Sequence, residues 1–319
     1  MNISKHRVKS FSVAIFANLC RYIFLIAFGF VLLYPFLYII INSLKSPLDF
    51  LDPSVQWAPK QFSFENFNMA IKALDFWRSL GNTLFYQIGA SLVQFLACMV
   101  AAYGLARFEF KGKRILMGIM ILSIIVPVMM TIVPNYINFS KIDFLGILGL
   151  VSRLVGRDVR PNLIDTPWVF YLPAITGVGI KGGLFIYIFT QFFKGLPKEL
   201  EEAAWIDGAG SWKTFLRIII PSSGAAAITV LIFSIVWHWN DYYLAQMYLS
   251  DNQTLSVVLG SLNEDTIVNI LGVGLDLARM NFVSIVFAAC LLGIAPMIVF
   301  YLIIQRKFIA SVANSGIVG

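Results

Sequence analysis

The chain has 319 residues, of which 59% are hydrophobic and only 13% are charged, and its mean hydropathy is +0.80. These values lie well outside the range of an ordinary soluble domain and exclude that class. The net charge of +7 would also suit a nucleic-acid-binding protein, so the distribution of the charges along the chain has to decide between the two. The composition therefore predicts a protein embedded in a lipid bilayer.

The first 18 residues are predicted to form a cytoplasmic segment with a basic head that contains Lys5, Arg7 and Lys9. The apolar run that follows is too long for the core of a signal peptide, and it lacks an obvious small-residue cleavage site. We therefore expect this run to be retained as the first membrane span.

Six apolar runs are long enough to cross a hydrocarbon core about 30 Å thick, which takes about twenty helical residues. The fourth and fifth runs are the least regular. The sequence thus predicts an all-α integral membrane protein with a transmembrane domain at residues 19–308 and a cytoplasmic tail at residues 309–319. The predicted spans are 19–42, 82–106, 115–137, 168–193, 223–249 and 282–304.

The basic residues gather on one side of this predicted topology. One side holds fourteen Lys and Arg against five acids, counted over the N-terminal region through Arg21, the loops after the second and fourth spans, and the end of the chain from Arg306, whereas the other side holds ten against twelve. Because basic loops stay in the cytoplasm, both termini and the loop 196–221 are predicted to be cytoplasmic. The basicity follows from topology, so we expect no nucleic-acid partner.

Three long segments face the other side, at residues 43–81, 138–167 and about 250–281, and we expect them to be ordered lids over the outer mouth. In the first, Ser63 precedes a short helical run. The second contains "FLGILGLVSRLVGRDVRPN", whose apolar spacing fits an amphipathic helix at the membrane interface. An ordinary external connection fits that stretch equally well.

The stretch "GVGIKGG" interrupts the fourth predicted span. Gly177, Gly179 and Gly182 have the spacing of a dinucleotide-binding loop, but no alternating strands and helices surround them, so we reject that match. Lys181 is costly if it faces lipid. It lies either in an external break of the span, which we favour, or against a pathway through the protein.

The stretch "ELEEAAWIDGAGSWKTFLRIIIP", residues 199–221, predicts a helix, a turn and a second helix. Pro197 suits the first turn, and the glutamates that follow favour the positive end of the helix dipole. Gly208 is expected to end the first helix in the left-handed conformation, and Ser211 is the candidate N-cap of the second.

A charged hairpin of this kind is suited to docking a partner, although a surface helix that merely connects two spans would look similar. A partner could approach the backbone closely at Ala203, Ala204 and Gly208, because their side chains are small or absent. The residues that offer bulky anchors of the type common at interfaces are Trp205, Ile206, Trp212 and Phe215.

The hairpin resembles the EAA loop of ABC-importer permeases, E-A-A-x3-G-x9-I-x-L-P, with Ile220 in place of the usual leucine. Further strings, "WHWNDYYLAQMYLSDNQTLSVVLG" among them, resemble the carbohydrate uptake branch, specifically permeases similar to the smaller subunit of the maltose transporter. Carried over by position, the resemblance assigns ATPase coupling to Glu202, Ala203, Ala204, Asp207, Gly208, Ile218 and Pro221.

The resemblance further implies a type I ABC importer permease fold in the bacterial plasma (inner) membrane. Six spans would form half of a saccharide pathway, shared with a second, non-identical permease. ATP and Mg would bind to two separate ATPase subunits and no cofactor to this chain, while an extracytoplasmic solute-binding protein would deliver the sugar. The tail "ANSGIVG" would run between the ATPases, where Val318 replaces the lysine usual in the family.

The stretch "WHWND" in the fifth predicted span has residue types that suit a neutral carbohydrate. Aromatic faces stack on sugar rings, and amide or carboxylate groups bind hydroxyls. An aromatic belt with polar contacts between helices is an equally good explanation. The candidate pathway residues are Trp237, Trp239, Asn240 and Asp241.

Two other classes of protein compete with the permease interpretation. An ion-coupled secondary transporter acting without ATPases would need buried carboxylates at mid-membrane, and Asp241 is the only acid in a predicted span. A membrane enzyme would need a nucleophile, a base or a metal cluster, and we find neither such a constellation nor a phosphate-binding loop. The EAA pattern favours a transport subunit that is not itself an enzyme.

Overall fold

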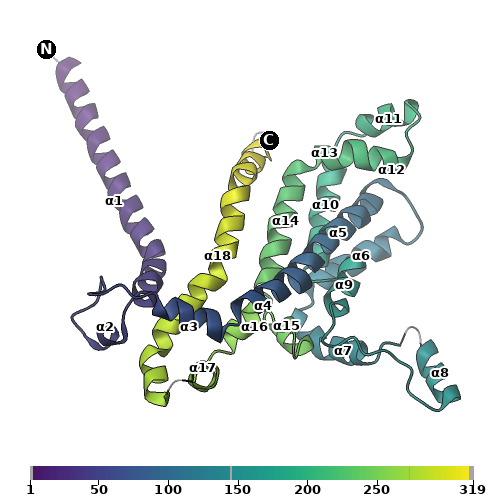
Figure 1. Ribbon diagram of the computed structural model, residues 1–319. Helices are drawn as coiled ribbons and strands as arrows, with labels where there is room; N and C mark the ends of the chain where they lie inside the picture. The colour runs from purple at the N-terminus through teal and green to yellow at the C-terminus, as the bar shows by residue number, and fades with distance from the viewer. Residues whose placement is uncertain (1–2, 144–145, 273, 316–319) are drawn as a thin grey trace. The chain divides into compact units, whose positions relative to one another are not determined.

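The computed structural model describes residues 3–143, 146–272 and 274–315 (Figure 1). These residues are mostly helical and form no β-strand, apart from one isolated bridge between Lys45 and Phe62. The chain divides into two compact units, residues 1–73 with 262–292, and residues 74–261 with 293–319. The first two residues of the predicted N-terminal segment, and residues 316–319 of the predicted tail, lie outside the described residues.

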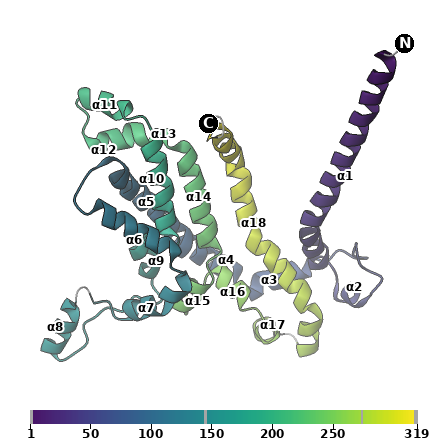
Figure 2. The ribbon, with the colours of Figure 1, turned by 180° about the vertical axis from the view of Figure 1, so that it is seen from behind.

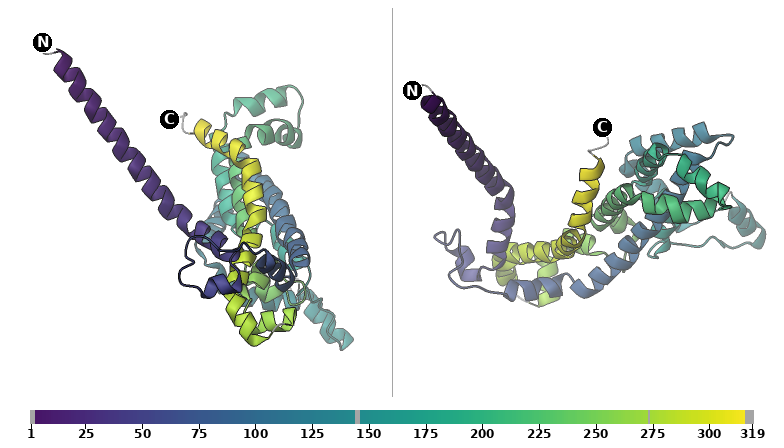
Figure 3. Two further views of the ribbon diagram at one scale, coloured as in Figure 1. Left: turned by 60° about the vertical axis from the view of Figure 1, so that its left-hand side comes forward. Right: turned by 90° about the horizontal axis from the view of Figure 1, so that it is seen from above.

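The first unit is built around α3, which packs on α17 (Figure 3). The amide of Asn66 in α3 donates to the carbonyls of Ser43 and Lys45 at 3.0 and 2.8 Å, which fixes the end of α1. The helical run expected after Ser63 is confirmed as α3, and its Glu65 N–H donates to the Ser63 hydroxyl. The helices are α1 (Ile3–Ser43), α2 (Pro47–Leu51), α3 (Glu65–Ala73), α17 (Glu264–Leu271) and α18 (Leu275–Ser315), whose part beyond Leu292 belongs to the second unit.

The second unit is a bundle in which α5 packs against α9, α10 and α14 (Figures 1 and 2). Phe185, Phe189 and Phe193 recur every fourth residue along α10 and are fully buried, so one face of that helix forms the centre of the core. The bundle consists of α4 (Phe76–Asn82), the π-helical turn Thr83–Ile88, α5 (Gly89–Arg107), α6 (Lys113–Ile125), α9 (Trp168–Ile175), α10 (Gly182–Gly195) and α14 (Gly224–Trp239).

Short helices lie at the two opposite ends of this bundle (Figures 1 and 2). At one end are α11 (Glu199–Ile206), α12 (Ser211–Thr214), the π-helical turn Phe215–Ile219 and α13 (Ile220–Ser222). At the other end are α7 (Val128–Ser140), α8 (Ile147–Val155), α15 (Tyr243–Tyr248) and α16 (Leu255–Gly260). The short helix expected in the second outer segment is confirmed as α8, and none of its residues is buried.

Three of the six predicted spans are continuous apolar helices, within Phe16–Ser43, Phe76–Arg107 and Arg279–Ile309. The third predicted span is instead bent by 107° between α6 and α7, because Val126 is held extended before Pro127. By length and composition, the described helices and bent pairs supply between three and five candidate spans.

The fourth predicted span consists of α9 and α10, separated by the "GVGIKGG" break. Gln94 of α5 holds the break by donating to the Ile180 carbonyl at 2.7 Å. A Cβ on Gly182 would collide with the Gly177 carbonyl, and a Cβ on Gly179 would collide with the Gln94 side chain. These glycines therefore allow close packing of the break against α5, in line with the rejection of a dinucleotide loop.

Candidate functional site

The EAA hairpin, residues 199–222, folds as a helix, a turn and a second helix, as predicted. Gly208 ends α11 with φ = 77°, and its N–H donates to the Trp205 carbonyl at 3.0 Å. The prediction of Ser211 as the N-cap is wrong: Gly210 occupies that position with extended backbone, and its carbonyl accepts the Thr214 N–H. Pro197 lies two residues before α11 rather than in its first turn.

One face of the hairpin is packed onto α5. Phe215 and Ile219 are 1% and 0% exposed, and the Phe215 ring stacks on Tyr103 with centroids 4.8 Å apart. Phe215 lies in a π-helical turn, which rotates the following side chains relative to a regular α-helix. The prediction that Phe215 is a surface anchor is therefore wrong, and this side chain seats the hairpin on the bundle.

A buried ion pair joins α11 to the end of α5. Arg107 Nε lies 2.8 Å from Glu201 Oε1, and the two side chains are only 5% and 4% exposed. Arg107 Nη2 also donates to the Leu196 carbonyl at 2.9 Å, immediately before the hairpin. Among the described residues, neither Arg107 Nε nor Glu201 Oε1 has a further hydrogen-bond partner. Sequence reasoning missed this pair, because both charges fit exposed cytoplasmic positions.

The opposite face of the hairpin is open. Trp205, Ile206 and Trp212 are 48%, 86% and 61% exposed, and apart from its chain neighbours no described residue has an atom within 4 Å of a Cβ built on Gly208. Of the predicted coupling residues, only Ala204 is buried and Ile218 is half-buried. The residues of that set that are exposed are Glu202, Ala203, Asp207, Gly208 and Pro221.

The four predicted pathway residues have different surroundings in the structure. Trp239 is only 8% exposed, and the Asn240 amide donates to the Val236 carbonyl at 2.9 Å. Asp241 Oδ2 accepts from the Gln87 amide at 2.9 Å, and its two oxygens also accept the N–H groups of Leu244 and Ala245. The Asp241 side chain thus accepts two N–H groups of the first turn of α15, and its hydrogen-bonding capacity is largely used within the protein.

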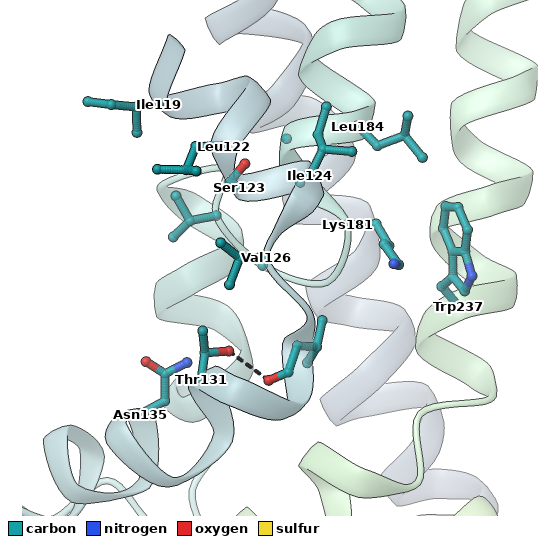
Figure 4. A pocket seen from close by; sticks show the side chains of 15 residues that line it. Ile119, Leu122, Ser123, Ile124, Val126, Thr131, Asn135, Lys181, Leu184 and Trp237 are labelled. Atoms are coloured by element: carbon teal, nitrogen blue, oxygen red, sulfur yellow. Dashed lines mark hydrogen bonds between the residues drawn. The ribbon is translucent and has the colours of Figure 1, made fainter. Parts of the chain in front are cut away.

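Trp237 is the member of this set that reaches a pocket, whose volume is about 470 Å³ (Figure 4). Lys181 Nζ lies 5.7 Å from the centroid of the Trp237 ring, and the two side chains face each other in the close-up. Ser123, Thr131 and Asn135 add polar groups from α6 and α7. Sequence reasoning missed these three, because nothing local distinguishes them from other polar residues within apolar helices.

The chain is similar in sequence to known transport proteins. The family described as "Binding-protein-dependent transport system inner membrane component" matches residues 94–314. The chain is 30% identical over 289 residues to the melibiose/raffinose/stachyose import permease protein MelC of Bacillus subtilis, covering 89% of this chain and 91% of the relative. It is 27% identical to the diacetylchitobiose uptake system permease protein NgcG of Streptomyces coelicolor, covering 91% and 85%.

A solved structure shares the fold. It is the crystal structure of a bacterial ABC transporter involved in the import of the acidic polysaccharide alginate. One chain of that structure superposes on this chain with a TM-score of 0.67 at 22% sequence identity. The superposition covers 93% of this chain and 98% of the other. The family match spans more than half of the chain, and MelC is similar over nearly all of it. The chain therefore belongs to the inner-membrane permeases of binding-protein-dependent transport systems, within the ABC importers of carbohydrates.

Proposed function

We propose that this permease forms half of the translocation pathway for a mono- or oligosaccharide in an ATP-driven importer. A second, non-identical permease supplies the other half, and two ATPase subunits bind ATP and Mg and dock on the EAA hairpin. An extracytoplasmic binding protein delivers the saccharide. The names of MelC and NgcG, which refer to oligosaccharide import and diacetylchitobiose uptake, support this substrate class.

The observation that carries the coupling role is the contrast between the two faces of the EAA hairpin. Phe215, Ile219 and the Arg107–Glu201 pair anchor its inner face, whereas its outer face presents small residues, carboxylates and two exposed tryptophans. A rigid support beneath an exposed, bulky surface is the arrangement expected where a partner's movement must be transmitted into a helix bundle. The excess of basic residues at this end of the topology supports a cytoplasmic position for the hairpin.

Purification of the tagged chain from its native membrane tests the assembly. We expect a second permease and an ATPase subunit to copurify in stable amounts, and the ATPase to be lost when Trp205 and Ile206 are both replaced by aspartate. The matched control replaces the exposed Ile147 and Leu154 of α8, at the opposite end of the bundle, by aspartate. A single-component protein that transports saccharide in liposomes without ATP would overturn the proposal.

Two neighbouring tryptophans separate a pathway role from a structural one. We expect Trp237→Ala to lower saccharide uptake about tenfold while the ATPase stays bound, since an aromatic face in the pocket is lost. Trp239→Ala should instead destabilise the fold by about 3–5 kcal/mol, because this ring is buried. Uptake kinetics and thermal unfolding are measured for both, with Trp237→Phe as the control that keeps a ring. Unchanged uptake in Trp237→Ala would favour the aromatic-belt explanation.

A further inference from the structure

The backbone of Lys181 is held in a conformation that is rare for a lysine. Its backbone has φ = 57°, a conformation that residues with a Cβ rarely adopt, and it caps the start of α10. The conformation is held by neighbours, since Gln94 donates to the Ile180 carbonyl and the Gly182 N–H donates to the Gly179 carbonyl at 2.9 Å. The break therefore fixes where the lysine side chain begins.

The depth of Lys181 along the bundle argues that it faces a pathway. α10 has 14 residues between Lys181 and the loop that leads to the EAA hairpin, which corresponds to about 21 Å of helix. Trp237, which faces Lys181, is at a similar distance from the start of α14. If the end of α10 at Gly195 marks one edge of a hydrocarbon core about 30 Å thick, this position is roughly two thirds of the way across. Because an ammonium is costly against lipid at such a depth, this favours the pathway over an external break.

The positive charge at this position is not neutralised by the described part of the chain. None of the ion pairs between described residues includes Lys181, and no acid lines the pocket that it shares with Trp237. The other polar side chains that line the pocket are Ser123, Thr131 and Asn135, and the two hydroxyls donate to the Met120 and Val128 carbonyls. A pocket with an aromatic side chain, hydroxyl and amide groups and one cation that has no anionic partner among the described residues matches a sugar ring that carries a negative charge.

We propose that this pocket is a saccharide subsite in which Lys181 binds the carboxylate of a uronic acid residue while Trp237 packs against the sugar ring. The proposal rests on the transport function proposed above and adds the charge of the substrate. A single ammonium balances the one charge of a carboxylate, whereas a phosphate monoester carries nearly two and usually engages several cations.

The test uses the complete importer, copurified with its partner permease and ATPases, reconstituted in liposomes and supplied with its binding protein. The probes are disaccharides of galacturonate, glucuronate and mannuronate, each paired with its carboxyl-reduced neutral counterpart. We expect the wild type to import at least one uronate. In Lys181→Met the ratio of uronate to neutral uptake should fall tenfold or more, and in Lys181→Arg it should be largely retained.

Three outcomes would overturn the subsite. In the first, the wild type imports neutral saccharides and no uronate, which leaves the proposed transport function intact. In the second, a uronate is imported and Lys181→Met leaves the ratio unchanged. In the third, Lys181→Met loses the partner permease during purification, which would mean that the lysine pairs with an acid of that subunit. Failure to import any saccharide at all would instead count against the proposed function itself.

Discussion

Valine in place of Gly208 is expected to abolish most saccharide uptake, either by uncoupling ATP hydrolysis from transport or by preventing the ATPase from binding. Gly208 has φ = 77°, where a β-branched residue is strongly disfavoured, so α11 would no longer end in the same way. The first atom of the added side chain meets no other described part of the chain, so steric obstruction there falls on a docked partner. We expect a loss of uptake of about tenfold or more, which corresponds to 1.4 kcal/mol.

Two further substitutions at Gly208 separate backbone strain from obstruction. Asparagine tolerates the left-handed conformation, so Gly208→Asn adds bulk with little strain, whereas Gly208→Ala adds strain with little bulk. If a bare surface is what the ATPase requires, the asparagine variant should be impaired almost as much as the valine variant. ATPase binding by copurification and ATP hydrolysed per saccharide imported are the two measurements.

Gly210 provides a control in the same turn. Its backbone has φ = −74° and ψ = 165°, and apart from its chain neighbours no described residue has an atom within 4 Å of a Cβ built there. Because serine is favoured at an N-cap, Gly210→Ser is expected to leave folding and coupling unchanged. Normal uptake together with normal ATPase assembly in Gly208→Val would argue against any docking role for this hairpin.

The features that could be predicted from the sequence are those governed by local rules. Apolar runs located the continuous spans, and the left-handed preference of glycine located the end of α11 at Gly208. The bend between α6 and α7 lies at Pro127, whereas residues 115–137 were predicted to form one span. That disagreement arises because length and hydropathy count apolar residues without regard to the extended backbone that a proline imposes on the residue before it.

Which side of a helix a residue faces was less predictable. Phe215 was expected on the surface, yet it is buried, and of the two tryptophans predicted for the pathway Trp237 lines the pocket whereas Trp239 is buried. Each helical residue turns about 100° from the last, so Trp237 and Trp239 face opposite sides although they are two positions apart. The π-helical turn that begins at Phe215 also changes the direction in which the following side chains point. No local sequence pattern predicts this turn.

The Arg107–Glu201 pair depends on tertiary structure alone. Its members are far apart in the sequence, and each had a sufficient local explanation: the arginine followed the positive-inside rule, and the glutamate favoured the start of a helix. Only the packing of α11 on the end of α5 brings them to 2.8 Å and buries both. This pair therefore supplies a test that the sequence did not suggest.

Removing either member of the pair is expected to destabilise the second unit by about 3–5 kcal/mol, because an uncompensated charge stays buried. Arg107→Met should cost more than Glu201→Gln, since it also leaves the Leu196 carbonyl without its donor. Loss of the pair should also loosen the EAA hairpin, so ATP hydrolysis per saccharide imported should rise in whatever fraction remains folded.

The double variant Arg107→Met with Glu201→Met decides between a structural and a positional role. Apolar pairs of similar volume often match or exceed the stability of the buried ion pair that they replace, so thermal unfolding should return close to that of the wild type. Coupling should recover only in part, because methionines do not fix the angle of α11 as an ion pair bonded to Leu196 does.

Glu199→Gln, an exposed change on the same helix, is the control, and its free energy of unfolding should stay within about 0.5 kcal/mol of the wild type. Full recovery of coupling in the double variant would show that filling the space suffices, and unchanged unfolding in both single variants would show that the pair contributes nothing to the fold.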